Sequence, residues 1–171
     1  MSQDSVPDPA TADAAHTGDH TRYLERAIDL AVANVVDGGG PFGAVVVMRD
    51  GTAYEGMNRV TRDNDPTAHA EVVAIRRAAV GTGDFDLHGA VLYSSCEPCP
   101  LCLAAALWAR VSAVYFAADR DDAAAAGFDD AVFYEYFAGT DRSLMPVAHT
   151  RLGRRAAPFD AWKAFEGRVE Y

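Results

Sequence analysis

The sequence is poor in cysteine and has no long apolar run. Only three of the 171 residues are cysteines, too few for a disulfide framework, so we expect a reducing compartment and a metal-binding or catalytic role for the thiols. No apolar run approaches the ~18 residues that span a bilayer. Residues 1–20 lack the basic and apolar segments of a secretory signal. We therefore predict a cytoplasmic protein that is not inserted in a membrane.

Positive charge is also scarce. Lys and Arg total 15 against 25 Asp and Glu, so the net charge is −10. A polyphosphate would be repelled by this field, which argues against extended nucleic acid as a ligand. Residues 1–20 contain four aspartates and no cation, and we predict that they form a disordered acidic tail in which His16 and His20 are solvated.

The remaining residues, 21–171, are predicted to form one α/β domain. Half of the chain is apolar, which is enough for a hydrophobic core. Apolar spacing and turn residues predict helices over 21–36, 67–80, 100–110, 121–126 and 158–167, and strands over 42–48, 52–60, 90–95 and 111–117. Strands that alternate with helices after an opening hairpin predict an α/β/α sandwich with a mixed central sheet.

Two short clusters carry the candidate chemistry, TAHAE at 67–71 and CEPCPLC at 96–102. A catalytic zinc takes three protein ligands and leaves a fourth position for water, which one His and two Cys would satisfy. Cys99 and Cys102 flank a helix start at Pro100, where free N–H groups stabilise thiolates. Cys96 ends the preceding strand and is predicted to pack as a small apolar residue. We therefore assign His69, Cys99 and Cys102 as the ligands.

Glu71 is the candidate proton carrier. It lies two residues after His69, a separation of about 200° on an ideal helix. Both side chains reach one cavity only if His69 lies at the very start of the helix, a position that the preceding Asp65-Pro66-Thr67 favours. A carboxylate beside a zinc-bound water is suited to general acid/base catalysis.

The ordered pair H-A-E and P-C-x-x-C is typical of zinc deaminases, whereas a lone C-x-x-C would equally fit a structural zinc knuckle or a redox pair. The whole of 21–171 resembles the bacterial guanine deaminases of the cytidine-deaminase fold. The segments that carry the resemblance are GGPFGAVVV (39–47), NDPTAHAE (64–71), SCEPCPLC (95–102), WAR (108–110), AGFDDA (126–131) and PFDAW…EY (158–171). Leu101, Ala104 and Ala106-Leu107 depart from the family pattern beside the expected pocket.

This resemblance implies a role for each matching residue. It implies one Zn²⁺ per chain on the three ligands, a proton shuttle at Glu71, and a second acid at Glu135. Contacts to the purine are implied for Phe42, Asn58, Trp108 and Asp130, and for Tyr171 of the partner chain. On the residues alone, Asn58 would equally be a turn residue, Asp130 a solvated loop charge, and both aromatic rings core residues.

The C-terminal segment 158–171 bears on the oligomeric state. Phe159, Trp162 and Phe165 recur every three residues, which first of all indicates a packing stripe on a helix. In guanine deaminases this segment crosses to the partner and closes its active site. The resemblance therefore implies a domain-swapped homodimer in which 158–171 forms the lid.

These observations predict hydrolytic deamination of a free purine base, most specifically guanine to xanthine and ammonia. The alternatives are a deaminase of guanosine, cytidine, cytosine or a triazine. A tRNA adenosine deaminase shares the core motifs but would need a basic surface that this acidic chain lacks. A non-catalytic zinc-stabilised binding module is a further alternative, and Glu71 argues against it because a structural zinc does not need that residue.

Overall fold

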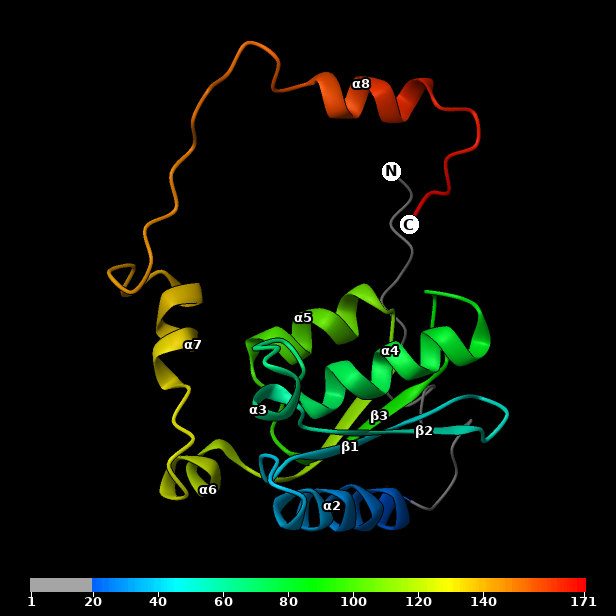
Figure 1. Ribbon diagram of the computed structural model, residues 1–171, viewed down its shortest axis with the longest axis vertical. Coiled ribbons are helices and arrows are strands. Elements are labelled where there is room, and N and C mark those ends of the chain that lie inside the picture. Colours follow the sequence, from blue (N-terminus) through cyan, green and yellow to red (C-terminus); the bar gives the residue numbers. More distant parts are fainter. Residues whose placement is uncertain (1–19) are drawn as a thin grey trace. The chain divides into compact units, whose positions relative to one another are not determined.

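The computed structural model describes residues 20–171 (Figure 1). The predicted tail therefore lies outside the described residues except for His20, the first residue of α2 (His20–Val36). Nδ1 of His20 lies 3.0 Å from the hydroxyl of Tyr93, and its ring stacks on Tyr115 at 4.1 Å. The prediction of a solvated His20 was wrong, because helix α2 starts early enough to bring this ring onto the sheet.

The chain divides into two units, one ending at Tyr134 and one covering Glu135–Tyr171. The first contains a four-stranded sheet in the order β2-β1-β3-β4. Its strands are β1 (Gly43–Val47), β2 (Ala53–Met57), β3 (Val91–Cys96) and β4 (Ala113–Ala118). β1 is antiparallel to both β2 and β3, whereas β3 and β4 are parallel. The sheet is mixed, as predicted.

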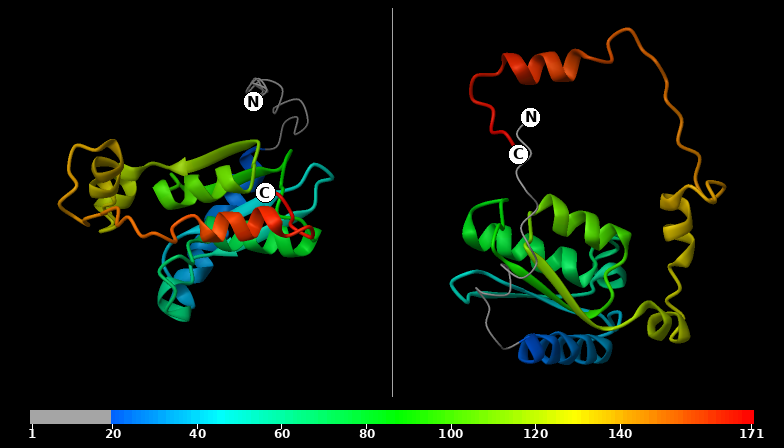
Figure 2. Two further views of the ribbon diagram at one scale, coloured as in Figure 1. Left: turned by 90° about the horizontal axis from the view of Figure 1, so that it is seen from above. Right: turned by 180° about the vertical axis from the view of Figure 1, so that it is seen from behind.

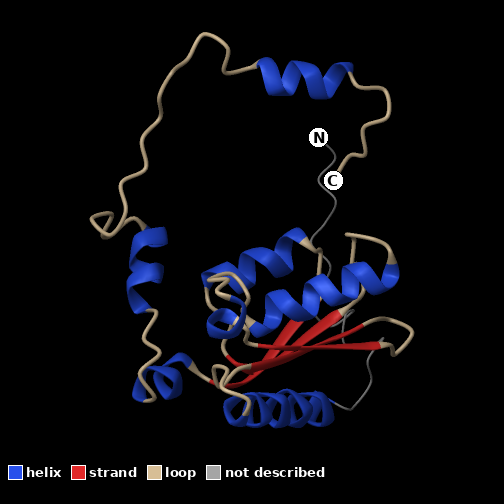
Figure 3. Cartoon of the chain, in the orientation of Figure 1, coloured by secondary structure: helices blue, strands red, loops and turns tan. Residues whose placement is uncertain are grey.

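Helices cover both faces of this sheet (Figures 1 and 3). Helix α2 packs on one face, while α4 (Ala70–Thr82) and α5 (Pro100–Trp108) lie on the other, an arrangement also visible from behind in Figure 2. All five residues of β1 are buried, since Val45 and Val47 join the core beneath α2 and Val46 joins the core beneath α4. Two apolar faces on one strand require cover on both sides, which confirms the predicted α/β/α sandwich.

Glycines let the helices approach the sheet closely. A side chain at Gly43 would overlap the backbone of α2 at Ala27, and one at Gly56 would overlap the backbone of α4 at Ala70. The edge strand β2 is thus held directly against the start of α4, which carries the H-A-E motif. Any larger residue at Gly56 would push that helix start away.

Three elements differ from the sequence prediction. β2 ends at Met57, and the short helix α3 (Val60–Asp63) follows it, closed by Asn64 in a left-handed conformation at φ 52°. Helix α6 (Arg120–Ala125) matches its prediction, but α7 (Ala131–Ala138) was not predicted. At its start, the N–H of Ala131, the first residue of α7, donates a hydrogen bond to the carboxylate of Asp129 (3.0 Å), which satisfies one of the free N–H groups of the first turn.

The second unit holds the end of α7 and helix α8 (Ala157–Ala164), close to the predicted helix at 158–167. Several of its apolar side chains are exposed in the single chain, with Phe159 at 67% and Phe165 at 60%. Trp162 contacts Tyr171 edge to face, with ring centroids 6.3 Å apart. Among residues 20–171, no helix is both long and apolar enough to cross a membrane.

Candidate zinc and substrate site

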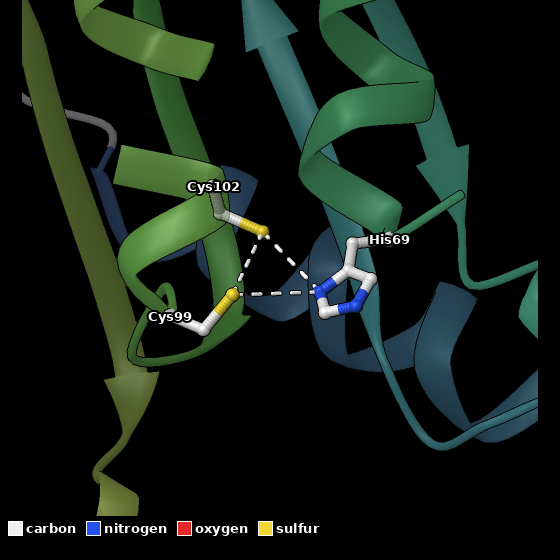
Figure 4. Close-up of side chains that lie close together, drawn as sticks. All are labelled: His69, Cys99 and Cys102. Atoms are coloured by element: carbon white, nitrogen blue, oxygen red, sulfur yellow. Dashed lines mark hydrogen bonds between the residues drawn. The ribbon is translucent and has the colours of Figure 1, made fainter. Parts of the chain in front are cut away.

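The three predicted metal ligands meet at the N-termini of two helices (Figure 4). His69 is the N-cap of α4 and Cys99 the N-cap of α5, and both have extended backbones at that point. Cys102 follows in the first turn of α5. Nδ1 of His69 lies 3.6 Å from Sγ of Cys99 and 3.5 Å from Sγ of Cys102, and the two sulfurs are 3.6 Å apart.

These distances fit a tetrahedral zinc ion. Zn–S bonds of about 2.3 Å and Zn–N bonds of about 2.0 Å place neighbouring ligand atoms roughly 3.5–3.8 Å apart in a tetrahedron. The three atoms observed here lie at that spacing and form one group. One imidazole and two thiols leave a fourth coordination position, which is the donor set of a catalytic rather than a purely structural site.

The protonation of the ligands favours a cation at this place. The hydrogen bond from Cys102, together with His69, lowers the pKa of the Cys99 thiol to about 4. The contact with Cys99 raises the pKa of His69. Cys99 and burial raise the pKa of the Cys102 thiol. One thiolate thus already sits beside a second thiol that can lose its proton only when positive charge is added, which a bound divalent metal would supply.

Glu71 reaches the same cluster. Its side chain is only 5% exposed, and its pKa is raised because burial removes the carboxylate from water. Oε1 accepts a hydrogen bond from the hydroxyl of Ser94 (3.0 Å), and Oε2 accepts one from the thiol of Cys102 (3.3 Å). His69 lies outside the helix with ψ 154°, and this confirms the condition under which His69 and Glu71 can face one cavity.

Cys96 lies apart from the three ligands. It ends β3, is 8% exposed, and its thiol contacts the carbonyl oxygen of Asp119 at 3.6 Å. This position agrees with the prediction of a packed, non-ligating residue.

A cavity of about 340 Å³ opens above the cluster. His69, Glu71 and Cys99 form part of its lining, together with Phe42 and Asn58. The ring of Phe42 meets Phe128 edge to face at 5.0 Å. The walls are therefore aromatic beside a polar, metal-binding end, a combination suited to a flat heterocycle.

Two predicted polar contacts line this cavity. Asn58 is 8% exposed, and its side-chain oxygen accepts a hydrogen bond from the N–H of Val60 (3.2 Å). Its Nδ2 has no hydrogen-bond partner among the residues that the structure describes, so the amide retains two donors. Burial, with the nearby Cys99, raises the pKa of Asp130. The neighbouring Asp129 also lines the cavity, but its carboxylate accepts a hydrogen bond from the N–H of Ala131, so the two aspartates have different surroundings.

The structure does not bring Trp108 to this cavity. Its side chain is 69% exposed and lines a separate surface depression with Ala104, Leu107 and Arg110. Cys102 and Trp108 share helix α5, but six residues of helix separate them by about 9 Å along the axis. Glu135 is exposed on α7 and Tyr171 is 73% exposed, and both belong to the second unit. Their roles stay predictions.

Two charged residues that were not predicted from the sequence, Glu97 and Arg120, also line the cavity. Arg120 forms an ion pair with Glu97, and its guanidinium lies 4.2 Å from the ring centroid of Tyr134. The hydroxyl of Tyr134 donates a hydrogen bond to the carbonyl of Pro98 (3.3 Å). These contacts tie the loop before Cys99 to α6 and α7. The sequence feature that could have pointed to this ion pair is Glu97, the glutamate within the C-E-P-C motif.

Comparison with known proteins now adds to this geometry. The model of the cytidine and deoxycytidylate deaminase zinc-binding region matches residues 17–118. The chain belongs to this family. Guanine deaminase of Bacillus subtilis is 47% identical over 154 residues, which make up 89% of this chain and 99% of that protein. The X-ray structure of that enzyme superposes with a TM-score of 0.85 and covers 90% of this deaminase-family chain.

More distant relatives share less of the chain. The structure of a guanine deaminase from Nitrosomonas europaea is 29% identical, with a TM-score of 0.60 over 75% of this chain and 79% of that one. A tRNA-specific adenosine deaminase of Agrobacterium fabrum is 37% identical over 100 residues, 58% of this chain and 66% of that protein. The predicted likeness to bacterial guanine deaminases, the cytidine-deaminase-like fold and a zinc-binding deaminase domain are all confirmed.

Proposed function

We propose that this protein is a zinc-dependent aminohydrolase that converts guanine to xanthine and ammonia in the cytoplasm. The observation that carries the proposal is the position of Glu71, a buried carboxylate 3.3 Å from the thiol of Cys102, beside three ligands with zinc spacing. A zinc ion that only stabilised the fold would not need an acid/base group there. The non-catalytic binding module is therefore disfavoured.

The roles of the protein groups follow from their positions. Zinc held by His69, Cys99 and Cys102 would supply a water of lowered pKa as the nucleophile. Ser94 fixes Oε1 of Glu71, so Oε2 is the oxygen that takes up a proton next to the cluster. Glu71 would then deliver that proton to a ring nitrogen and, in a second transfer, would carry the proton of the hydroxyl added to the base to the departing ammonia.

The walls of the cavity fit a guanine base. Asn58 offers two N–H donors to a carbonyl or ring nitrogen, and the carboxylate of Asp130 accepts hydrogen bonds from ring or exocyclic N–H groups. Phe42 supplies a flat apolar surface. The likeness to guanine deaminase covers 89% of the chain, whereas the tRNA-specific relative covers 58%, and a net charge of −10 opposes RNA binding.

The proposal includes a homodimer that exchanges residues 158–171. In the single chain, Phe159 is 67% exposed and Tyr171 is 73% exposed. Apolar rings exposed at this density are typical of an interface rather than of a solvated chain end. A lid from the partner would exclude water, and the lower dielectric would strengthen the hydrogen bonds of Asn58 and Asp130.

Ammonia release from a panel of substrates tests the reaction. We expect turnover of guanine, and little or none of guanosine, cytosine, cytidine, adenine and ammeline, by protein that contains one zinc per chain. Preferred turnover of another member would replace guanine as the substrate. No release from any member by the zinc-loaded protein would support the binding-module alternative.

Mixing two inactive chains tests the exchanged lid. A chain that lacks 158–171 should keep zinc but lose most of its activity, and full-length Glu71→Gln should also be inactive. Together they should regain activity, because one mixed site would combine an intact Glu71 with the partner's lid. Subunit exchange is checked by mass spectrometry with a tag on one chain. An inactive mixture despite exchange would mean that 158–171 packs on its own chain.

A further inference from the structure

Helix α2 carries an amide where its apolar face should continue. The buried residues of this helix are Ala27, Leu30, Ala31 and Asn34, a helical spacing that faces the sheet. Asn34 is only 1% exposed. A buried amide is costly unless it is hydrogen-bonded, so the contacts of Asn34 show what it does at the end of this face.

Two hydrogen bonds of the Asn34 amide lead to the walls of the substrate cavity. Its Nδ2 donates hydrogen bonds to the carbonyl oxygens of Gly40 (2.8 Å) and Asn58 (2.7 Å). Gly40 and Asn58 both line the cavity, whereas Asn34 does not. One side-chain nitrogen therefore holds two wall segments, one before β1 and one after β2, against α2.

The surrounding loop is shaped to this contact. The N–H of Asn58 donates to the carbonyl of Phe42 (3.0 Å), which joins the two wall segments to each other. A side chain at Gly39 would overlap the amide of Asn34, and one at Gly40 would come within 3.1 Å of the Asn58 amide. The two glycines thus let Asn34 and Asn58 approach the loop from opposite sides.

We propose that Asn34 is a positioning residue that sets where the Asn58 amide stands in the cavity, and so controls affinity for the base. The inference rests on the proposed function, in which the Asn58 amide contacts the substrate. Asn34 itself does not touch the substrate. If the two carbonyls were released, the Asn58 side chain would shift away from the base, and a misplacement of about 1 Å can cost up to about 100-fold in rate.

A double-mutant cycle tests this coupling. We expect Asn34→Ala to lower kcat/KM for guanine by about 10- to 100-fold, chiefly through a higher KM, with zinc content unchanged. In the Asn58→Ala background, Asn34→Ala should lower kcat/KM by less than about threefold, because the side chain that Asn34 positions is absent. The bond from Asn34 goes to the backbone oxygen of residue 58 and remains available in that background.

A matched control separates positioning from stability. Leu30→Ala removes a buried apolar side chain of the same helix face, which belongs to the core cluster of Val45 and Val47 and lacks the amide that binds Gly40 and Asn58. At a temperature where circular dichroism shows both variants folded, Leu30→Ala should keep KM within about threefold of the wild type. Gly39→Ala gives an independent perturbation, since its new methyl group displaces the Asn34 amide from the loop side. It should raise KM as Asn34→Ala does, and it provides the test if Asn34→Ala fails to fold.

The outcomes separate this inference from the proposed reaction. Wild-type turnover of guanine tests the reaction by itself. If guanine is turned over but Asn34→Ala lowers kcat/KM by the same factor with and without Asn58→Ala, Asn34 contributes only to folding and the inference is wrong. It is equally wrong if Asn58→Ala leaves KM unchanged, or if Leu30→Ala raises KM as much as Asn34→Ala.

Discussion

Replacement of Glu71 by glutamine isolates its proton transfer from its packing. Glutamine has the same size, and Ser94 can keep its hydrogen bond because its hydroxyl can either donate or accept. Zinc ligation should be intact, since the three ligands are unchanged. Loss of a general acid/base of this kind lowers kcat by about 10²- to 10⁴-fold, or roughly 3 to 5 kcal/mol of transition-state stabilisation.

The same substitution should not weaken the fold. The side chain is 5% exposed and burial raises its pKa, so a neutral amide is easier to bury than the carboxylate. We expect a thermal unfolding midpoint at pH 7 no lower than that of the wild type. Turnover per bound zinc, with zinc measured by mass spectrometry, is the appropriate readout.

The control for this experiment is Glu25→Gln, the same chemical change at an exposed position of α2. It should leave kcat, zinc content and the unfolding midpoint within error of the wild type. Near-normal turnover by zinc-loaded Glu71→Gln would refute the shuttle assignment. Loss of zinc from that variant would instead show that the carboxylate supports the metal site.

Two further predictions concern the metal and the fold. Cys99→Ala and Cys102→Ala should each lose most bound zinc, whereas Cys96→Ala should retain it with a modest loss of stability; metal analysis that finds Cys96→Ala zinc-free would overturn the ligand choice. Glu55→Gln should lower the free energy of unfolding at pH 7 by about 0.5 to 1 kcal/mol, because it removes a half-exposed bidentate pair with Arg26. The hydrogen bond from Arg26 lowers the pKa of Glu55, so this difference should shrink as the pH falls below the usual glutamate pKa of 4.5 and through the lowered value. Urea unfolding of both forms at several pH values measures it, and a difference that persists at the lowest pH would contradict the ion-pair explanation.

Local sequence indicated the three candidate metal ligands because each depends on a helix start. Pro100 fixes the first turn of α5, which places Cys99 and Cys102 together, and the position of His69 at the N-cap of α4 follows from the residues before it. The alternation of strands and helices likewise specified the mixed sheet. These features depend on residues a few positions apart, so the sequence shows them directly.

Other predictions rested on the family resemblance, and neighbouring residues in the sequence could not decide which of these side chains line the cavity. Asp129 and Asp130 are adjacent and chemically identical, and both line the cavity, but only the start of α7 decides that the Asp129 carboxylate accepts a hydrogen bond from the N–H of Ala131. Trp108 was expected at the substrate but lies one and a half turns beyond Cys102 on α5, at a different surface. Helix direction, rather than residue type, decides which side chains share a cavity.

The tertiary structure alone decided how distant segments combine into one site. His69 and Cys99 are 30 residues apart, and their helix N-termini meet only because α4 and α5 pack on the same face of the sheet. Asn34 resembles any polar residue near a helix end until α2 docks on the opposite face and its amide reaches Gly40 and Asn58. Contacts of this kind depend on sheet order and helix placement, which arise from the packing of the whole domain and leave no signal within a short stretch of sequence.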